Sequence, residues 1–126
     1  MTNTPFRPRI WLLKSCPFCL KLRIALSEMG MEPRVDYIVF EKGDAAEADL
    51  RDRLTRAGIK PSYPAAEVAP GDYATESDDL IARYAREAGV DPESDLPLLD
   101  YYRDGVFAKF LDMFQQLKDA GHDPAA

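Results

Sequence analysis

The feature that most constrains the fold of this chain is the sequence Cys16-Pro17-Phe18-Cys19, which follows an apolar run over residues 10–13. A short apolar run of this kind predicts a buried strand of a parallel sheet. Pro17 predicts the first position of a helix, because proline fixes a helical φ and lacks an N–H that would have no partner there. Cys16 would then be the N-cap residue, where free N–H groups and the helix dipole favour a thiolate. Cys19 lies one turn later on the same face, so we expect a redox dithiol at a strand-to-helix junction.

Other uses of the two cysteines are weaker interpretations. They are the only cysteines in the 126-residue chain, and free cysteines often serve simply as small buried hydrophobes. A zinc site usually needs four ligands, and the chain adds only one histidine, His122. A Cys–His hydrolase is disfavoured because His122 lies in a Gly/Asp/Pro/Ala tail without an evident orienting partner. The redox interpretation is favoured because a Cys-x-x-Cys pair behind a strand is itself a redox motif.

Composition limits the class of protein and its partners. The chain is 46% hydrophobic and 30% charged, which is typical of one globular domain with a real core. Its net charge of −6 argues against a nucleic-acid partner. No stretch approaches the roughly 18 apolar residues of a membrane span, and the N-terminal residues lack the layout of a secretory signal. We therefore expect a cytoplasmic protein with no membrane partner, where a lone cysteine pair is more often catalytic than structural.

The rest of the chain predicts alternating strands and helices. After the first strand (residues 9–13) and helix (17–29), we expect a strand over 35–40 and a charged helix with a solvated face over 45–57. A hairpin follows, with strands over 65–69 and 73–75 around a turn at 70–72, and then a helix that Ser77 or a near neighbour caps. A right-handed crossover joins the first two strands. The predicted fold class is α/β, with the order β-α-β-α-β-β-α and a four-stranded mixed sheet.

The C-terminal part of the chain predicts one further helix over residues 98–118, after a Pro/Asp-rich connector. Its apolar residues recur at helical spacing, so they form either a face that packs back on the domain or a homodimer interface. The members of this stripe are Val106, Phe107, Phe110, Leu111, Phe114 and Leu117. We expect a domain over residues 1–90, and over 91–126 a connector, helix and short mobile tail that do not form an independent domain.

With the motif and the element order in hand, the chain resembles the glutaredoxins and the related N-terminal domain of glutathione transferases, over about residues 9–90. Cys16-Pro17-Phe18-Cys19 is similar to the dithiol glutaredoxin active site. Ser62-Tyr63-Pro64 lies where that fold carries a cis-proline facing the active-site cysteine. In the segment Thr75-Glu76-Ser77-Asp78-Asp79-Leu80, the Glu-Ser pair is similar to the transferases and Ser-Asp-Asp-Leu to the glutaredoxins. The resemblance implies a thioredoxin-like fold with an extra C-terminal helix.

The sequence also departs from these families. Glutaredoxins often carry a lysine three residues before the first cysteine, whereas Lys14 lies two before Cys16. Thr75-Glu76 stands where glutaredoxins have Gly-Gly. Glutathione transferases add a full helical domain, of which this chain offers one helix.

The resemblance implies a glutathione-dependent thiol-disulfide oxidoreductase that acts on protein disulfides or glutathione mixed disulfides. Cys16 would be the nucleophile and Cys19 the resolving cysteine. Glutathione would be the co-substrate and disulfide-containing or glutathionylated proteins the partners, with no metal. The expected glutathione-binding residues are Lys14, Phe18, Tyr63, Pro64, Glu76, Ser77 and Asp78.

Each end of glutathione has an expected partner. The tripeptide would pair with the main chain of Tyr63 as an added strand. Ser77 and the N–H groups that open its helix would bind the γ-glutamyl carboxylate, and Glu76 or Asp78 the ammonium. Lys14 or Lys60 would meet the glycine carboxylate.

Three alternative functions stay open. The chain could be a single-domain protein similar to glutathione transferases that conjugates a small electrophile. It could be a non-enzymatic module that binds glutathione or a partner protein. An iron–sulfur cluster bridging two chains is disfavoured because Pro17 stiffens the site.

Overall fold

The computed structural model describes residues 5–122, which fold around one mixed four-stranded sheet. The strand order is β2-β1-β3-β4; β1 pairs with β2 in parallel, and β3 pairs with β1 and β4 in antiparallel. This topology confirms the predicted fold class and element order. The strands are β1 (Arg9–Leu13), β2 (Asp36–Phe40), β3 (Ala65–Ala69) and β4 (Asp72–Thr75). The helices are α1 (Pro17–Glu28), α2 (Ala45–Arg56), α3 (Ser77–Ala88), α4 (Pro97–Tyr102) and α5 (Ala108–Asp119).

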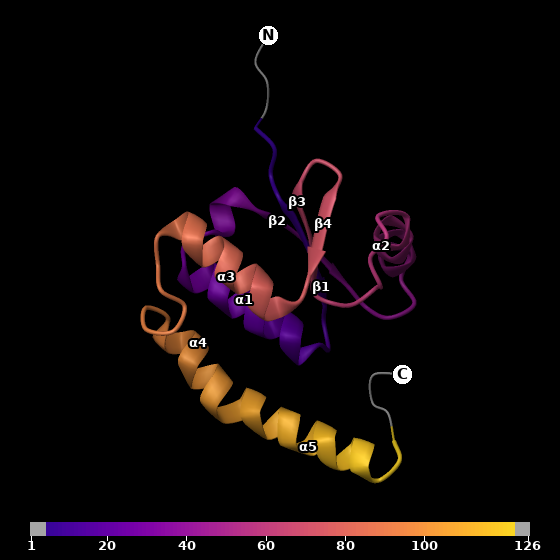
Figure 1. Cartoon of the computed structure of the whole chain (residues 1–126), viewed down its shortest axis with the longest axis vertical. Coiled ribbons are helices and arrows are strands. Elements are labelled where there is room, and N and C mark those ends of the chain that lie inside the picture. Colours follow the sequence, from indigo (N-terminus) through magenta and orange to yellow (C-terminus); the bar gives the residue numbers. More distant parts are fainter. Residues whose placement is uncertain (1–4, 123–126) are drawn as a thin grey trace.

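The helices form two layers around the sheet. Figure 1 shows α1 and α3 side by side on one face and α2 on the other. The α1–α3 layer buries most of the core, because α1 and α3 present apolar stripes at helical spacing to the sheet. By contrast, α2 buries only Leu50 and Leu54, as its thin apolar content predicts. The buried side chains of the α1–α3 layer include Leu22, Ala25, Leu26, Leu80, Ile81 and Tyr84.

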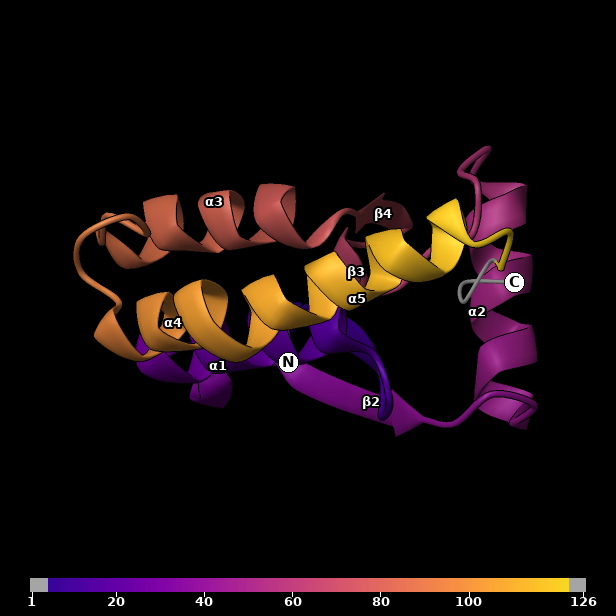
Figure 2. The ribbon, with the colours of Figure 1, turned by 90° about the horizontal axis from the view of Figure 1, so that it is seen from below.

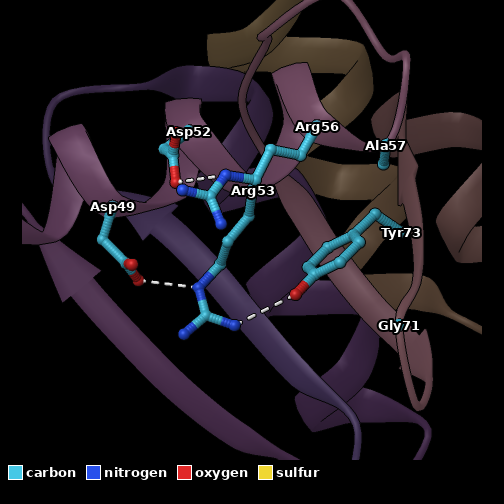
Figure 3. A pocket seen from close by; sticks show the side chains of 7 residues that line it. All are labelled: Asp49, Asp52, Arg53, Arg56, Ala57, Gly71 and Tyr73. Atoms are coloured by element: carbon cyan, nitrogen blue, oxygen red, sulfur yellow. Dashed lines mark hydrogen bonds and ion pairs between the residues drawn. The ribbon is translucent and has the colours of Figure 1, made fainter.

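A charged residue on the surface of α2 forms a hydrogen bond to the β3–β4 hairpin. Arg53 pairs with Asp49 at 2.8 Å, one turn earlier, and its guanidinium also donates to the Tyr73 hydroxyl of β4 at 3.0 Å. These groups lie beside a second pair, Arg56–Asp52, in a shallow pocket between α2 and the β3–β4 turn (Figure 3). The charges in this pocket therefore satisfy one another, which agrees with the prediction of a solvated face.

At the start of α3, the N-cap position is held by the near neighbour of Ser77 and not by Ser77 itself. Ser77 is the first helical residue and is buried, while Glu76 holds the N-cap position without a side-chain capping hydrogen bond. Glu76 has a φ of 76°, a left-handed conformation that is costly for a residue with a side chain. Because the chain turns at Glu76, Ser77 lies inside the helix and does not cap it.

The predicted C-terminal helix is interrupted by a π-helical turn, Arg103–Phe107, between α4 and α5. Gly105 lies in this turn, where its low helix propensity favours a departure from regular α-helix. The first part packs on the domain: Leu99, Tyr102 and Phe107 are buried against α1.

The α4 helix is fastened to both ends of α1. The Glu28 carboxylate, at the end of α1, accepts hydrogen bonds from the backbone N–H groups of Leu98 (2.7 Å) and Leu99 (2.9 Å). These N–H groups open α4 and have no intrahelical partner, so the carboxylate caps the helix from outside. At the other end, the Tyr102 hydroxyl donates to the Pro17 carbonyl at 2.8 Å. The segment around α4 is thus part of the domain's packing.

The α5 helix projects beyond this packed segment. None of its side chains is buried, and Leu111, Met113 and Leu117 are 42–55% exposed. It runs past the edge of the sheet where α1 begins, toward the side of α2 (Figures 1 and 2). The predicted homodimer interface on this stripe stays a prediction. No helix within residues 5–122 is long and apolar enough to cross a membrane, and the last residues of the predicted tail, 123–126, lie outside the described part of the chain.

We predict that Glu28→Ala lowers the free energy of unfolding by about 1–2 kcal/mol, because it leaves two N–H groups of α4 without their carboxylate acceptor. Urea denaturation followed by the fluorescence of the buried Trp11 measures this. Glu32→Ala is the matched control: Glu32 makes only a half-exposed pair with Arg23, and its loss should cost less than about 0.5 kcal/mol. Equal effects of the two variants would contradict the capping role of Glu28.

Candidate active site

Cys16 is the N-cap residue of α1, as predicted. It has extended backbone angles (φ −96°, ψ 116°), and Pro17 is the first helical residue. The Cys16 Sγ accepts a hydrogen bond from the backbone N–H of Cys19 at 3.3 Å. The sulfur therefore does what a serine or aspartate oxygen usually does at a helix start, and it is only partly buried.

Cys19 lies deeper, in the first turn of α1. Its side chain is 2% exposed, and its Sγ accepts a hydrogen bond from the backbone N–H of Leu13 at 3.4 Å. Both cysteines are free thiols. The pair thus has one accessible sulfur and one buried sulfur on the same helical turn.

This arrangement separates the acidities of the two thiols. Hydrogen bonding from the Cys19 side chain is the main cause that lowers the pKa of Cys16 from 9.0 to about 7. Partial burial opposes this shift, while the N–H groups of Cys19 and Phe18 and the charge of Lys42 add to it. The same hydrogen bond, together with burial, raises the pKa of Cys19. Near neutral pH, a substantial fraction of Cys16 is therefore thiolate, while Cys19 keeps its proton.

The loop before β3 faces this thiol. The peptide bond between Tyr63 and Pro64 is cis, as the family resemblance implied, and the Tyr63 carbonyl oxygen lies 4.0 Å from the Cys16 Sγ. Pro64 is buried, while Tyr63 is partly exposed. The structure therefore brings the main chain of Tyr63 beside the Cys16 sulfur.

One ion pair joins the start of α3 to α1. Asp78 accepts a hydrogen bond from the Lys21 ammonium at 2.8 Å. Lys21 is buried, and its ammonium also lies 4.5 Å from the centre of the Phe107 ring. Asp78 is therefore engaged by Lys21, whereas Glu76 is exposed at its positive-φ position. Ser77, between them, is buried.

The cation that acts on Cys16 is Lys42, which sequence reasoning missed. The expected contact of Lys14 or Lys60 with the glycine carboxylate of glutathione stays a prediction. Lys14 and Lys60 are both exposed, but the lysine whose charge lowers the pKa of Cys16 is Lys42, just after β2. A sequence signal for it existed. Since β1 and β2 are parallel neighbours, the residues that follow them meet at one edge of the sheet.

Two aromatic residues of the C-terminal segment also reach the site. Phe18, inside the cysteine motif, packs edge-to-face on Phe107, with ring centres 5.3 Å apart. Tyr102 is fixed to the Pro17 carbonyl, and its pKa is raised by burial and by the nearby Cys16. Neither contact has a local sequence signal, because tertiary packing joins positions 85 or more residues apart. Within residues 5–122, no group of three His, Cys, Asp or Glu side chains is arranged to hold a metal ion.

We predict that the reactivity of Cys16 toward iodoacetamide rises with pH around a midpoint near 7. In Cys19→Ala the midpoint should move toward the value of about 8.5 for an ordinary thiol, since the main hydrogen bond to the thiolate is lost. Lys42→Ala should raise it less, because this charge is the smallest of the contributions that lower the pKa. Alkylation rates measured across pH check this, and an unchanged midpoint in Cys19→Ala would refute the assigned cause.

Comparisons with solved structures identify the fold that carries this site. Neither a family model nor a curated protein matches the chain. Among solved structures, glutathione transferase Omega 2C from Trametes versicolor is 22% identical over 68% of this chain and 39% of its own, with a TM-score of 0.51. Glutathione transferase Omega 2S from the same organism, in complex with 2,4-dihydroxybenzophenone, is 21% identical over 90% of this chain and 53% of its own, with a TM-score of 0.52.

The chain thus spans between about two fifths and just over half of the length of these proteins. At this sequence identity the similarity establishes the fold alone. The chain has the thioredoxin-like fold that glutathione transferases share.

Proposed function

We propose that the protein is a glutathione-dependent thiol-disulfide oxidoreductase. The observation that carries this proposal is the position of Cys16: its sulfur caps α1, has a pKa lowered to about 7, and lies 4.0 Å from the Tyr63 carbonyl. A partly exposed thiolate near neutral pH is both a ready attacker and a good leaving group in disulfide exchange. The main chain beside it offers an extended edge on which a peptide thiol can align.

With a glutathionylated protein as substrate, one cysteine completes the reaction. The Cys16 thiolate attacks the glutathione sulfur of the mixed disulfide, which forms a Cys16–glutathione disulfide and releases the protein cysteine as a thiolate. A second glutathione, as thiolate, then attacks the glutathione sulfur of that disulfide. Oxidised glutathione leaves, and Cys16 returns as the thiolate that its hydrogen bonds stabilise.

With a protein disulfide, Cys19 is needed as well. Cys16 attacks one sulfur and forms a mixed disulfide with the substrate, releasing the first substrate thiolate. Cys19 then gives up its proton and attacks the Cys16 sulfur, which releases the second substrate thiolate and leaves a Cys16–Cys19 disulfide. Two glutathione molecules reduce this disulfide and leave as oxidised glutathione. Because Cys19 is buried and its pKa is raised, it stays protonated until Cys16 is no longer a thiolate.

Glutathione recognition would use three parts of the site. Its cysteine backbone would pair with Tyr63 as an added strand. Its γ-glutamyl carboxylate would lie at the N-terminus of α3, beside Ser77, with the ammonium on the exposed Glu76 because Asp78 is held by Lys21. The glycine carboxylate would meet Lys42, whose charge already lowers the pKa of Cys16.

A second candidate is a transferase that conjugates glutathione to an electrophile. The fold shared with the two Omega transferases favours it, and two half-buried aromatic residues of the C-terminal segment, Phe110 and Phe114, offer a surface for an apolar substrate. A third candidate, a module that only binds glutathione or a partner protein, needs no reactive thiol. The lowered pKa of Cys16 favours the oxidoreductase over this module.

We predict that Cys16→Ser abolishes glutathione-dependent reduction of both a glutathionylated peptide and a protein disulfide, because the nucleophile is lost. Cys19→Ser should retain deglutathionylation and lose reduction of the protein disulfide. Coupled assays of oxidised glutathione formation measure both activities. Full activity of Cys16→Ser would reject the oxidoreductase, and conjugation of an electrophile as its main activity would favour the transferase.

A further inference from the structure

We propose that Glu47 is a positioning residue that fixes two loops on either side of Cys16 at one separation. One loop joins β2 to α2 and carries Lys42; the other precedes β3 and carries Tyr63. This inference rests on the proposed function, because it assigns to Glu47 the task of holding both sides of the glutathione site in place.

The two oxygens of the Glu47 carboxylate have separate partners. Oε1 accepts a hydrogen bond from the backbone N–H of Gly43 at 2.9 Å. Oε2 accepts one from the Tyr63 hydroxyl at 2.7 Å. These bonds, the first being the larger contribution, hold the pKa of Glu47 below its ordinary value, so the group is a carboxylate at neutral pH. The Glu47 side chain therefore joins the loop before α2 to the loop before β3, in which Tyr63 lies 16 residues after Glu47.

Both loops face the reactive sulfur. Gly43 directly follows Lys42, whose charge lowers the pKa of Cys16. The Tyr63 carbonyl lies 4.0 Å from the Cys16 Sγ. The Glu47 carboxylate thus bonds to the residue that follows Lys42 and to the side chain of Tyr63.

The Tyr63 side chain is held at its tip and along its ring. Besides the bond to Glu47, its hydroxyl accepts a hydrogen bond from the Arg51 guanidinium at 3.4 Å. Its ring packs edge-to-face on Phe40, the last residue of β2, with ring centres 5.1 Å apart. A ring fixed in this way also fixes the main chain that bears it, which is the edge proposed to pair with glutathione.

Ordinary helix capping explains only half of this arrangement. A glutamate in the first turn of α2 is favoured by the helix dipole and by nearby free N–H groups. That preference accounts for the bond to Gly43. It does not account for a tyrosine hydroxyl that reaches α2 from the loop before β3, and this second bond carries the inference.

A site whose two sides are fixed in advance binds its ligand without the cost of ordering them. Losing the Glu47 carboxylate should therefore weaken glutathione binding, while the thiolate keeps its main hydrogen bond from Cys19. We expect the KM for glutathione to rise about tenfold in Glu47→Ala, because both loops lose the carboxylate that holds them. The kcat should stay within about twofold, because the chemistry at Cys16 is unchanged.

The test compares steady-state kinetics of four variants with varied glutathione and one glutathionylated peptide. Tyr63→Phe should raise the KM less than Glu47→Ala, because it removes one of the two bonds. The double variant should be no worse than Glu47→Ala, since the two residues act through one contact. Asp49→Ala is the matched control: it removes a carboxylate from the same helix whose partner is Arg53, in the pocket of Figure 3, and should leave the KM unchanged.

Three results would overturn the proposal: an unchanged KM in a folded Glu47→Ala, a rise of the same size in Asp49→Ala, or additive effects of Glu47→Ala and Tyr63→Phe. If Glu47→Ala does not fold, Glu47→Gln and Tyr63→Phe take its place. Glu47→Gln should keep the KM close to that of the unmodified chain, because its amide can still bond both partners.

If the unmodified chain has no activity at all, the proposed function is rejected, but the contacts of Glu47 still need a separate test. Hydrogen exchange then decides between them: Glu47→Ala should speed exchange of the Gly43 and Tyr63 amides, while Asp49→Ala should not. Unchanged exchange at both amides would reject the positioning role as well.

Discussion

The structure depends on the hydrogen bonding of one sulfur at the start of α1. The Cys16 Sγ accepts the Cys19 N–H that a helix N-terminus would otherwise leave without a partner. The pKa of this capping group is lowered mainly by the Cys19 side chain and further by the N–H groups of the helix start. Folding and reactivity share this contact. The buried Cys19 keeps its proton more firmly than Cys16, and this difference supports the proposed division into an attacking and a resolving thiol.

Elements distant in sequence converge on this helix start. The loop before β3 brings the Tyr63 carbonyl to it, and the loop after β2 brings Lys42. The C-terminal segment reaches it through Tyr102, whose helix is anchored at the other end of α1 by Glu28. The added helix α4 therefore belongs to the surroundings of the thiol, which gives it a role that a domain ending after α3 would lack.

Local rules predicted much of this fold and the centre of its site. The strand before the motif, the helix start at Pro17 and the loop at Tyr63 each follow from residue type and short-range pattern. Contacts set by register or tertiary packing were not predictable in this way. The position of Lys42 near the site depends on the parallel pairing of β1 and β2. The contact of Tyr102 with Pro17 depends on the packing of α4 against α1, 85 residues apart in the sequence. The Arg103–Phe107 turn and the strained Glu76 likewise need the whole fold to hold them.

The central claim is that Cys16 is the nucleophile that accepts glutathione, and intact-protein mass spectrometry tests it most directly. The Cys19→Ser variant, mixed with a glutathionylated peptide, should gain the mass of one glutathione, with the adduct located on Cys16 after proteolysis and removed by added glutathione. A variant that gains no adduct, or gains one on another residue, would contradict the account.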